Sequence, residues 1–149
     1  MQIWVDADAC PTAIKDIIFK AAQRRQIQVT LVANQYIRVP KSPFIQSMQV
    51  SSGFDEADNL IADRTEPGDL VITADIPLAA RVVENGGTAL NPRGTLYDKE
   101  TVRSHLSRRD FMQELRDTGT ITGGPAPLNK THIQEFANEF DRYLTKYSG

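Results

Sequence analysis

Short apolar runs alternate with stretches of helical periodicity over the first 92 residues, and this alternation restricts the fold more than any other feature. Residues 3–5 and 70–72 are continuous apolar runs between turn signals, which is typical of strands buried on both faces. Between them, Ile14, Ile17 and Ile18 recur at helical spacing after Pro11, whose ring suits the first turn of a helix. Strands that alternate with helices predict an α/β domain with a mainly parallel sheet.

The same criteria predict about five strands, at residues 3–5, 27–34, 47–51, 70–72 and 88–90. Helices are expected from residues 11, 55 and 75. After residue 94 the pattern becomes polar and helical, with no strand signal. There we expect a helix at 110–116, a loop at 118–128 and a final helix with these residues inward: Ile133, Phe136, Ala137, Phe140 and Leu144.

The composition is that of an ordinary globular protein, with 40% apolar and 24% charged residues in 149. We expect one domain, with residues 1–94 forming the α/β core and residues 95–149 a helical extension packed on it. No apolar run is long enough to span a membrane, and residues 3–5 are too short for a signal peptide, so no membrane partner is expected. The single cysteine, Cys10, excludes an internal disulfide framework and favours a cytoplasmic location.

Acidic residues recur where strands end and helices begin. Asp6 follows the first strand, Asp55 and Asp58 stand in the first turn of a helix, and Asp75 closes the fourth strand. Right-handed crossovers bring these positions to one edge of a parallel sheet, where open α/β sheets bind ligands. Clustered carboxylates repel unless a divalent cation neutralises them, and oxygen ligands favour Mg²⁺ or Mn²⁺ over zinc. Each acid is also a good helix N-cap, so capping is the alternative role for any one of them.

Several motifs together resemble one family. They are "DADACP" (6–11), "GFDEADNLI" (53–61), "GDLVITADIPLA" (68–79), "ALNPRG" (89–94) and "GGPAPL" (123–128), and they look like the YaiI/YqxD family of bacterial proteins over nearly the whole chain. The family itself implies no particular reaction. Its first part is similar to PIN-like and NYN-like nuclease domains, which are Rossmann-like three-layer folds that cut RNA with clustered acids and Mg²⁺ or Mn²⁺.

Carried over by position, this resemblance assigns the site residues. The implied metal ligands are Asp6, Asp55, Asp58 and Asp75, and the implied catalytic residues are Asp6, Asp8, Asp58 and Asp75. The NYN type usually offers a further acid two residues after the strand-end acid, where this chain has Pro77. The departure weakens the case for two-metal catalysis more than the case for a single bound metal.

Two residues after the last predicted strand are candidates for substrate binding. Asn91 and Arg93 follow residues 88–90 on the presumed active edge, where Arg93 could grip a phosphate, although Asn-Pro-Arg-Gly is also an ordinary turn. Cys10 is interpreted as structural. His105 and His132 are expected at the surface, and Arg108 and Arg109 are expected to face water, with a position over the site as the alternative for these two arginines. The segment "TGGP" (122–125) is interpreted as a connector.

Three functions remain open at this point. The first is a metal-dependent nuclease acting on RNA or another single-stranded nucleic acid. The second is a haloacid-dehalogenase-like phosphatase, because an apolar strand followed by D-x-D resembles the opening of that family, with Asp6 as nucleophile and Asp8 as general acid. The third is a non-catalytic module that binds nucleic acid or a protein partner. The sequence leaves open the natural substrate, endo- or exonucleolytic cleavage, the number of metal ions and the oligomeric state, a homodimer included.

Overall fold

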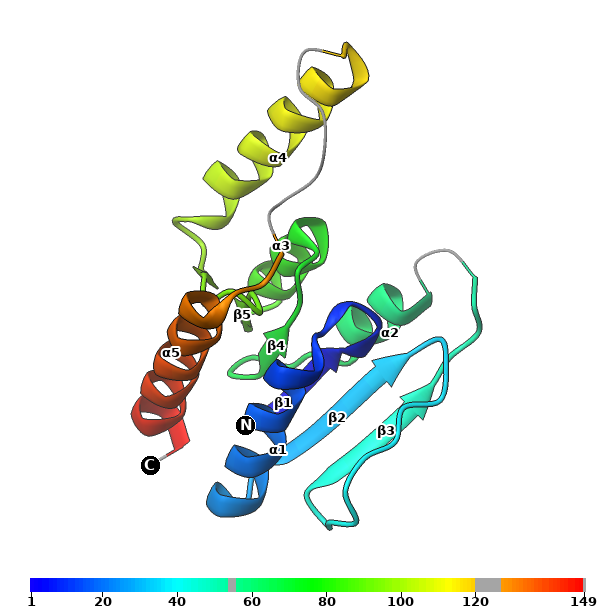
Figure 1. Ribbon diagram of the computed structural model, residues 1–149, viewed down its shortest axis with the longest axis vertical. Coiled ribbons are helices and arrows are strands. Elements are labelled where there is room, and N and C mark those ends of the chain that lie inside the picture. The colour runs from blue at the N-terminus through cyan, green and yellow to red at the C-terminus, as the bar shows by residue number, and fades with distance from the viewer. Residues whose placement is uncertain (54–55, 120–126, 149) are drawn as a thin grey trace.

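The structure is a computed structural model that describes residues 1–53, 56–119 and 127–148. Its centre is a six-stranded sheet with the order β3-β2-β1-β4-β5-β6 (Figure 1). The strands are β1 (Gln2–Asp6), β2 (Gln28–Ala33), β3 (Ile45–Gln49), β4 (Leu70–Ile72), β5 (Thr88–Leu90) and β6 (Leu96–Tyr97). All neighbours pair in parallel except β5 and β6, which are antiparallel.

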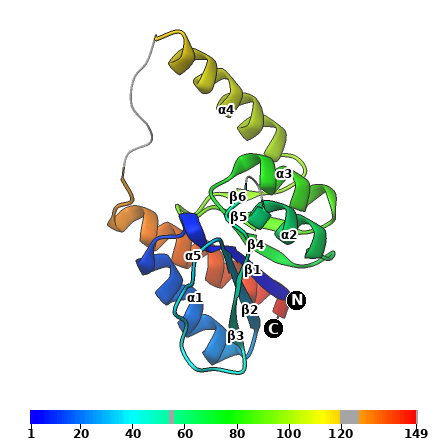
Figure 2. The ribbon, with the colours of Figure 1, turned by 90° about the vertical axis from the view of Figure 1, so that its right-hand side faces the viewer.

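Helices cover both faces of the sheet and make three layers (Figure 2). α1 (Thr12–Arg25) and α5 (Lys130–Ser148) lie on one face, and α2 (Glu56–Arg64) and α3 (Ile76–Glu84) lie on the other. A short 3₁₀ helix, η1 (Ala7–Ala9), follows β1, and α4 (Val102–Asp117) follows β6. This architecture confirms the predicted α/β, Rossmann-like arrangement with a mainly parallel sheet.

The alternation of side chains along the central strands explains the layering. Ile3 and Val5 of β1 join the apolar cluster under α1 and α5, whereas Trp4 between them joins the cluster under α2 and α3. In β4, Val71 likewise joins the cluster opposite its two neighbours. Because both faces are buried, these strands carry continuous apolar runs, which is the pattern that predicted them.

Two strand predictions need correction. The third strand is β3 (Ile45–Gln49), two residues before the predicted 47–51. The segment after Gly94 was predicted to hold no strand, yet Leu96–Tyr97 forms β6. Two residues are too few to give a period, so the strand signal could not be seen. β6 forms because Asn91 and Thr95 close a tight turn that carries the chain back along β5.

The two C-terminal helices differ in how they contact the sheet. α5 inserts Phe136, Phe140 and Leu144 into the core, as predicted. α4 is longer than the predicted 110–116 and projects from the body beyond its first turns (Figures 1 and 2). Val102 is its one buried residue in the described chain, and Phe111 is 58% exposed. None of the described helices is long and apolar enough to cross a membrane.

Candidate active site

Asp6 ends β1 at the carboxyl edge of the sheet and is buried there, with 8% of its surface exposed. Its Oδ2 atom accepts a hydrogen bond of 3.0 Å from the hydroxyl of Thr73, the residue that follows β4. The same hydroxyl accepts a 3.0 Å bond from the backbone N–H of Asp75. Thr73 therefore ties the ends of two neighbouring strands together and fixes the orientation of the Asp6 carboxylate.

The electrostatic environment of Asp6 disfavours its ionised form. Burial raises the pKa of Asp6 above its ordinary value, the hydrogen bond from Thr73 opposes that shift, and the carboxylates of Asp75 and Asp8 raise the pKa further. Asp75 and Asp8 therefore lie close enough to Asp6 to affect its ionisation. Asp8 itself is exposed, and its Oδ2 accepts a 2.8 Å bond from the backbone N–H of Asn34, just after β2.

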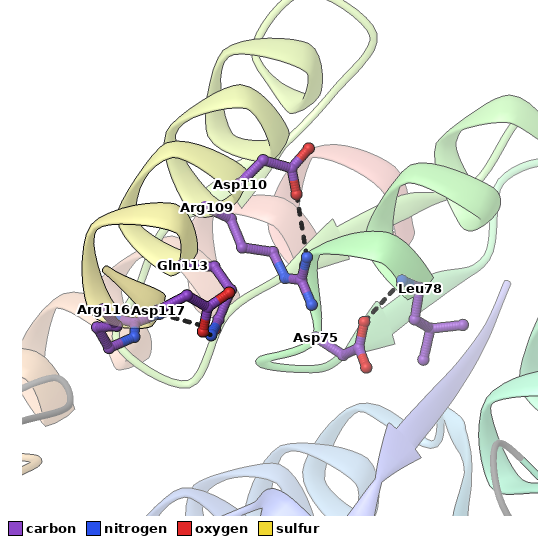
Figure 3. A network of polar contacts seen from close by, with 7 residues as sticks. All are labelled: Asp75, Leu78, Arg109, Asp110, Gln113, Arg116 and Asp117. Carbon is purple, nitrogen blue, oxygen red and sulfur yellow. Dashed lines mark hydrogen bonds and ion pairs between the residues drawn. The ribbon is translucent and has the colours of Figure 1, made fainter. Parts of the chain in front are cut away.

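Asp75 has the helix-capping role that its position before α3 allows. It is the N-cap of α3, and its Oδ1 accepts a 3.0 Å bond from the N–H of Leu78 (Figure 3). Only one carboxylate oxygen is needed for the cap, so capping leaves the second oxygen available to a ligand. Figure 3 also shows Arg109 of α4, paired with Asp110 at 3.1 Å, with its side chain extending toward this end of α3.

The other two predicted ligands are Asp58 and Asp55. Asp58 is half-buried in the first turn of α2, and Asp55 lies outside the described residues. Within residues 1–53, 56–119 and 127–148, no group of three or more His, Cys, Asp or Glu side chains is placed to hold a metal ion. The structure thus brings Asp6, Asp8 and Asp75 to one edge without gathering them into a formed coordination shell.

A pocket of about 700 Å³ adjoins these acids. Its wall includes Ala9, which follows Asp8, and Ala74 and Ile76, which flank Asp75. Basic and polar residues also line it: Asn91, Arg93, His105 and Arg108. The carboxyl edge therefore has an acidic part and a basic part side by side.

Arg93 is held by an ordered turn. Asn91 Oδ1 accepts a 2.7 Å bond from the backbone N–H of Arg93, and Asn91 Nδ2 donates to the hydroxyl of Tyr97 at 3.2 Å. Gly94 ends the turn with φ of +96°, and a Cβ there would lie 2.8 Å from the backbone of Glu135 in α5. The turn predicted between strand and extension is thus packed against α5, and it places Arg93 in the pocket.

The start of α5 contributes a further contact to Arg93. Asn129 Oδ1 accepts from the backbone N–H of His132, and His132 Nδ1 in turn accepts from the backbone N–H of Asn129. This reciprocal pair is a capping box in which histidine stands where glutamate is usual. Arg93 Nη1 lies 3.2 Å from the same Nδ1 atom. Because Nδ1 receives the Asn129 N–H, it is the acceptor for Arg93 as well.

Sequence reasoning missed three residues of this edge. Thr73 carried a weak signal, as a polar residue directly after an apolar strand. Arg108 is exposed, as expected, but it also lines the pocket together with the half-buried His105, which was expected to face water. His105 packs edge-on against Tyr97, with ring centroids 4.9 Å apart. Nothing in the local sequence of α4 indicates which of its arginines faces the sheet.

Cys10 lies near Asp6, in surroundings that disfavour the thiolate form. It is buried, and burial raises the pKa of its thiol to about 12, with Lys15 opposing the shift and Asp6 adding to it. The thiol therefore stays protonated at neutral pH, which agrees with its interpretation as structural.

Comparison with known proteins identifies relatives that cover the full length of the fold. Residues 4–146 match the family described as "Uncharacterized BCR, YaiI/YqxD family". A UPF0178 protein of Shewanella amazonensis is 61% identical over 146 residues, covering 98% of both chains. A UPF0178 protein of Pectobacterium carotovorum is 62% identical over 144 residues, covering 97% of this chain and 96% of its own. No solved structure matches significantly. The chain is a member of the YaiI/YqxD family.

Proposed function

We propose that this protein is a metal-dependent nuclease that cleaves RNA or another single-stranded nucleic acid. The observation that supports the proposal is the division of the carboxyl edge into an acidic part, with Asp6, Asp8 and Asp75, and an adjoining pocket with Arg93 and Arg108. A phosphodiester needs both parts, a cation held by acids at the reacting phosphorus and guanidinium groups on the flanking phosphate.

The donor set of the acidic part fits a divalent cation of the Mg²⁺ or Mn²⁺ type. Each of Asp6, Asp8 and Asp75 uses one oxygen in a hydrogen bond, and its other oxygen makes none to the described residues. All donors are carboxylate oxygens, which hard cations prefer. A bound cation would neutralise the repulsion that acts on Asp6 and would supply an activated water for hydrolysis. Asp58, in the first turn of α2, and Asp55, which lies outside the described residues, complete the proposed ligand set.

The residues of the chain have separate tasks in this proposal. Asp6 is the central ligand, and the hydroxyl of Thr73 keeps its carboxylate directed along the strand end. Asp75 presents its second oxygen while its first caps α3. Arg93 binds a phosphate oxygen of the substrate from its ordered turn.

The test is cleavage of a labelled single-stranded RNA with Mn²⁺ by the wild type and by Asp6→Asn, with a chelator as control. We expect cleavage that disappears with the chelator and falls about a hundredfold or more in the variant, as for loss of one group that stabilises developing charge. Cleavage of equal rate in the two proteins, at matched folding, would remove Asp6 from the mechanism. Absence of cleavage in the presence of Mn²⁺-dependent RNA binding would favour the non-catalytic module.

The phosphatase alternative is tested in the same preparation with a generic phosphomonoester. In that reading Asp8 donates a proton to the leaving group, but its Oδ2 is bonded to the N–H of Asn34. A later acid of this chain, Asp69, precedes β4 and lies at the opposite edge of the sheet. We therefore expect no hydrolysis that depends on both Asp6 and Asp8.

A further inference from the structure

The pocket beside the acids combines two kinds of wall. Ile76, Pro92 and Leu128 give apolar surface, whereas Arg93, His105 and Arg108 give nitrogen donors. The described residues that line it include no aspartate or glutamate. At about 700 Å³ it is within the range of pockets that bury a small organic molecule and exceeds what a lone phosphate ion needs.

The positive charge in the pocket is placed from two independent elements. Arg93 comes from the turn after β5, which Gly94 packs against α5, and Arg108 comes from α4. Leu128, which also lines the pocket, lies two residues before the start of α5 at Lys130. The planar N–H donors of a guanidinium group match the geometry of phosphate oxygens.

From this arrangement we infer that the pocket binds a nucleoside monophosphate unit, with the phosphate between Arg93 and Arg108 and the base against the apolar wall. The inference rests on the proposed function for its biological setting, because the neighbours of Asp8 and Asp75 line the same pocket. A nucleotide held there, at the phosphorylated terminus of an RNA chain, presents the next phosphodiester of that RNA to Asp6. The enzyme then cleaves from the terminus of the RNA and releases mononucleotides.

The inference is tested without cleavage, by calorimetric titration of adenosine 5′-monophosphate and of adenosine in low salt with a chelator. The variant is Arg108→Ala, whose residue is exposed and should not affect folding. The matched control is Arg103→Ala, an exposed arginine of the same helix that does not line this pocket. Melting temperatures confirm that all three proteins are folded.

We expect the monophosphate to bind the wild type about tenfold or more tightly than adenosine does, and Arg108→Ala to lose most of that difference. Arg103→Ala should bind like the wild type. Equal binding of adenosine and its monophosphate, or equal loss in both variants, would overturn the inference. Binding of the monophosphate without any Mn²⁺-dependent cleavage would uphold the pocket and reject the nuclease, and the reverse result would do the opposite.

A second titration identifies the source of the unit. Three RNAs of one sequence, with a 5′-phosphate, a 3′-phosphate or hydroxyl groups at both ends, are compared on the same proteins. Tighter binding of one phosphorylated RNA, lost in Arg108→Ala, supports a strand end as the occupant. A free mononucleotide is the occupant if the monophosphate binds and the three RNAs do not differ.

Discussion

Two buried aspartates at opposite edges of the sheet show how one residue type can serve structure or chemistry. Asp69, before β4 at the amino edge, is 7% exposed, and Asp6, after β1 at the carboxyl edge, is 8% exposed. Asp69 accepts three N–H groups, from Gln2 at 3.0 Å, from the Trp4 indole at 3.3 Å and from Glu66 at 3.0 Å. Asp6 accepts one hydroxyl and has two other carboxylates near it.

The difference lies in what balances the charge. The donors around Asp69 satisfy both of its oxygens and tie the start of β1 to the turn before β4, so it needs nothing from outside. Asp6 lacks enough donors for a buried carboxylate, and its neighbours add repulsion. The ionised carboxylate of Asp6 therefore lowers the stability of the folded protein, and a bound cation would reverse that loss of stability.

The largest effect on stability is expected from Asp69→Asn. The amide places an N–H group against backbone or indole N–H groups in a buried site, so the free energy of unfolding should fall by about 3 kcal/mol. Urea denaturation at neutral pH measures it. If the free energy of unfolding does not change, the carboxylate of Asp69 is not needed by its three N–H donors, and the contrast between the two edges fails.

The next largest loss of stability is expected from substituting a glycine at each edge of the sheet. Gly94 and Gly68 both have a left-handed backbone, with φ of +96° and +89°, but a Cβ at Gly94 meets α5 at 2.8 Å, whereas one at Gly68 meets nothing within 4 Å. We expect Gly94→Ala to cost about 2 kcal/mol and Gly68→Ala about 1 kcal/mol. Only Gly94→Ala should also weaken nucleotide binding, because it displaces the turn that holds Arg93. Equal behaviour of the two variants would separate that turn from the pocket.

In the absence of divalent ions, Asp6→Asn is expected to raise the free energy of unfolding. Burial first, and then the carboxylates of Asp75 and Asp8, raise the pKa of Asp6 in the folded state. The wild type therefore loses stability as the pH rises through that folded pKa, and the asparagine variant does not. At neutral pH the variant should be the more stable protein, by less than Asp69→Asn loses.

The control for this prediction is the pH itself. At about pH 3 Asp6 is protonated in the folded and the unfolded chain, so the stability difference between wild type and variant should disappear. Denaturation curves across the acid range give the answer. A variant that is less stable than the wild type at neutral pH would show that the Thr73 bond outweighs burial and repulsion.

The smallest effect concerns the reactivity of the Cys10 thiol, whose pKa depends in part on Asp6. Burial raises the pKa of its thiol to about 12, Lys15 opposes this, and Asp6 contributes to it. Reaction with a chromogenic disulfide at pH 8 should be about a hundredfold or more slower in the native protein than in urea. Asp6→Asn should quicken the native reaction slightly. A thiol that reacts equally fast in both states would contradict its burial.

The fold was largely predictable because its strands are buried on both faces and its helices repeat an apolar face. Ile3, Trp4 and Val5 must be apolar whichever helix layer they meet, and that run is visible in one sequence. Strand-end positions then predicted that Asp6 and Asp75 would share an edge. Asp6 and Asp75 do lie near each other, since each is bonded to Thr73.

The basic half of the site was not predictable to the same extent. Arg93 could be placed at the edge because it follows a strand. The position of Arg108 depends on the two-residue strand β6 and on the direction that α4 takes after it. Both depend on tertiary packing, which leaves no period in the local sequence. The role of Asp69 was equally hidden, because its partner Trp4 is 65 residues away in the chain.

Mn²⁺-dependent RNA cleavage by Asp6→Asn and Asp69→Asn, at a temperature where both remain folded, distinguishes the two edges most directly. We expect Asp6→Asn to be the more stable protein and to lose cleavage about a hundredfold or more, whereas Asp69→Asn should be the less stable protein and should cleave at nearly the wild-type rate. If Asp6→Asn cleaves as the wild type does, or if both variants lose cleavage alike, the division between a structural and a chemical edge is wrong.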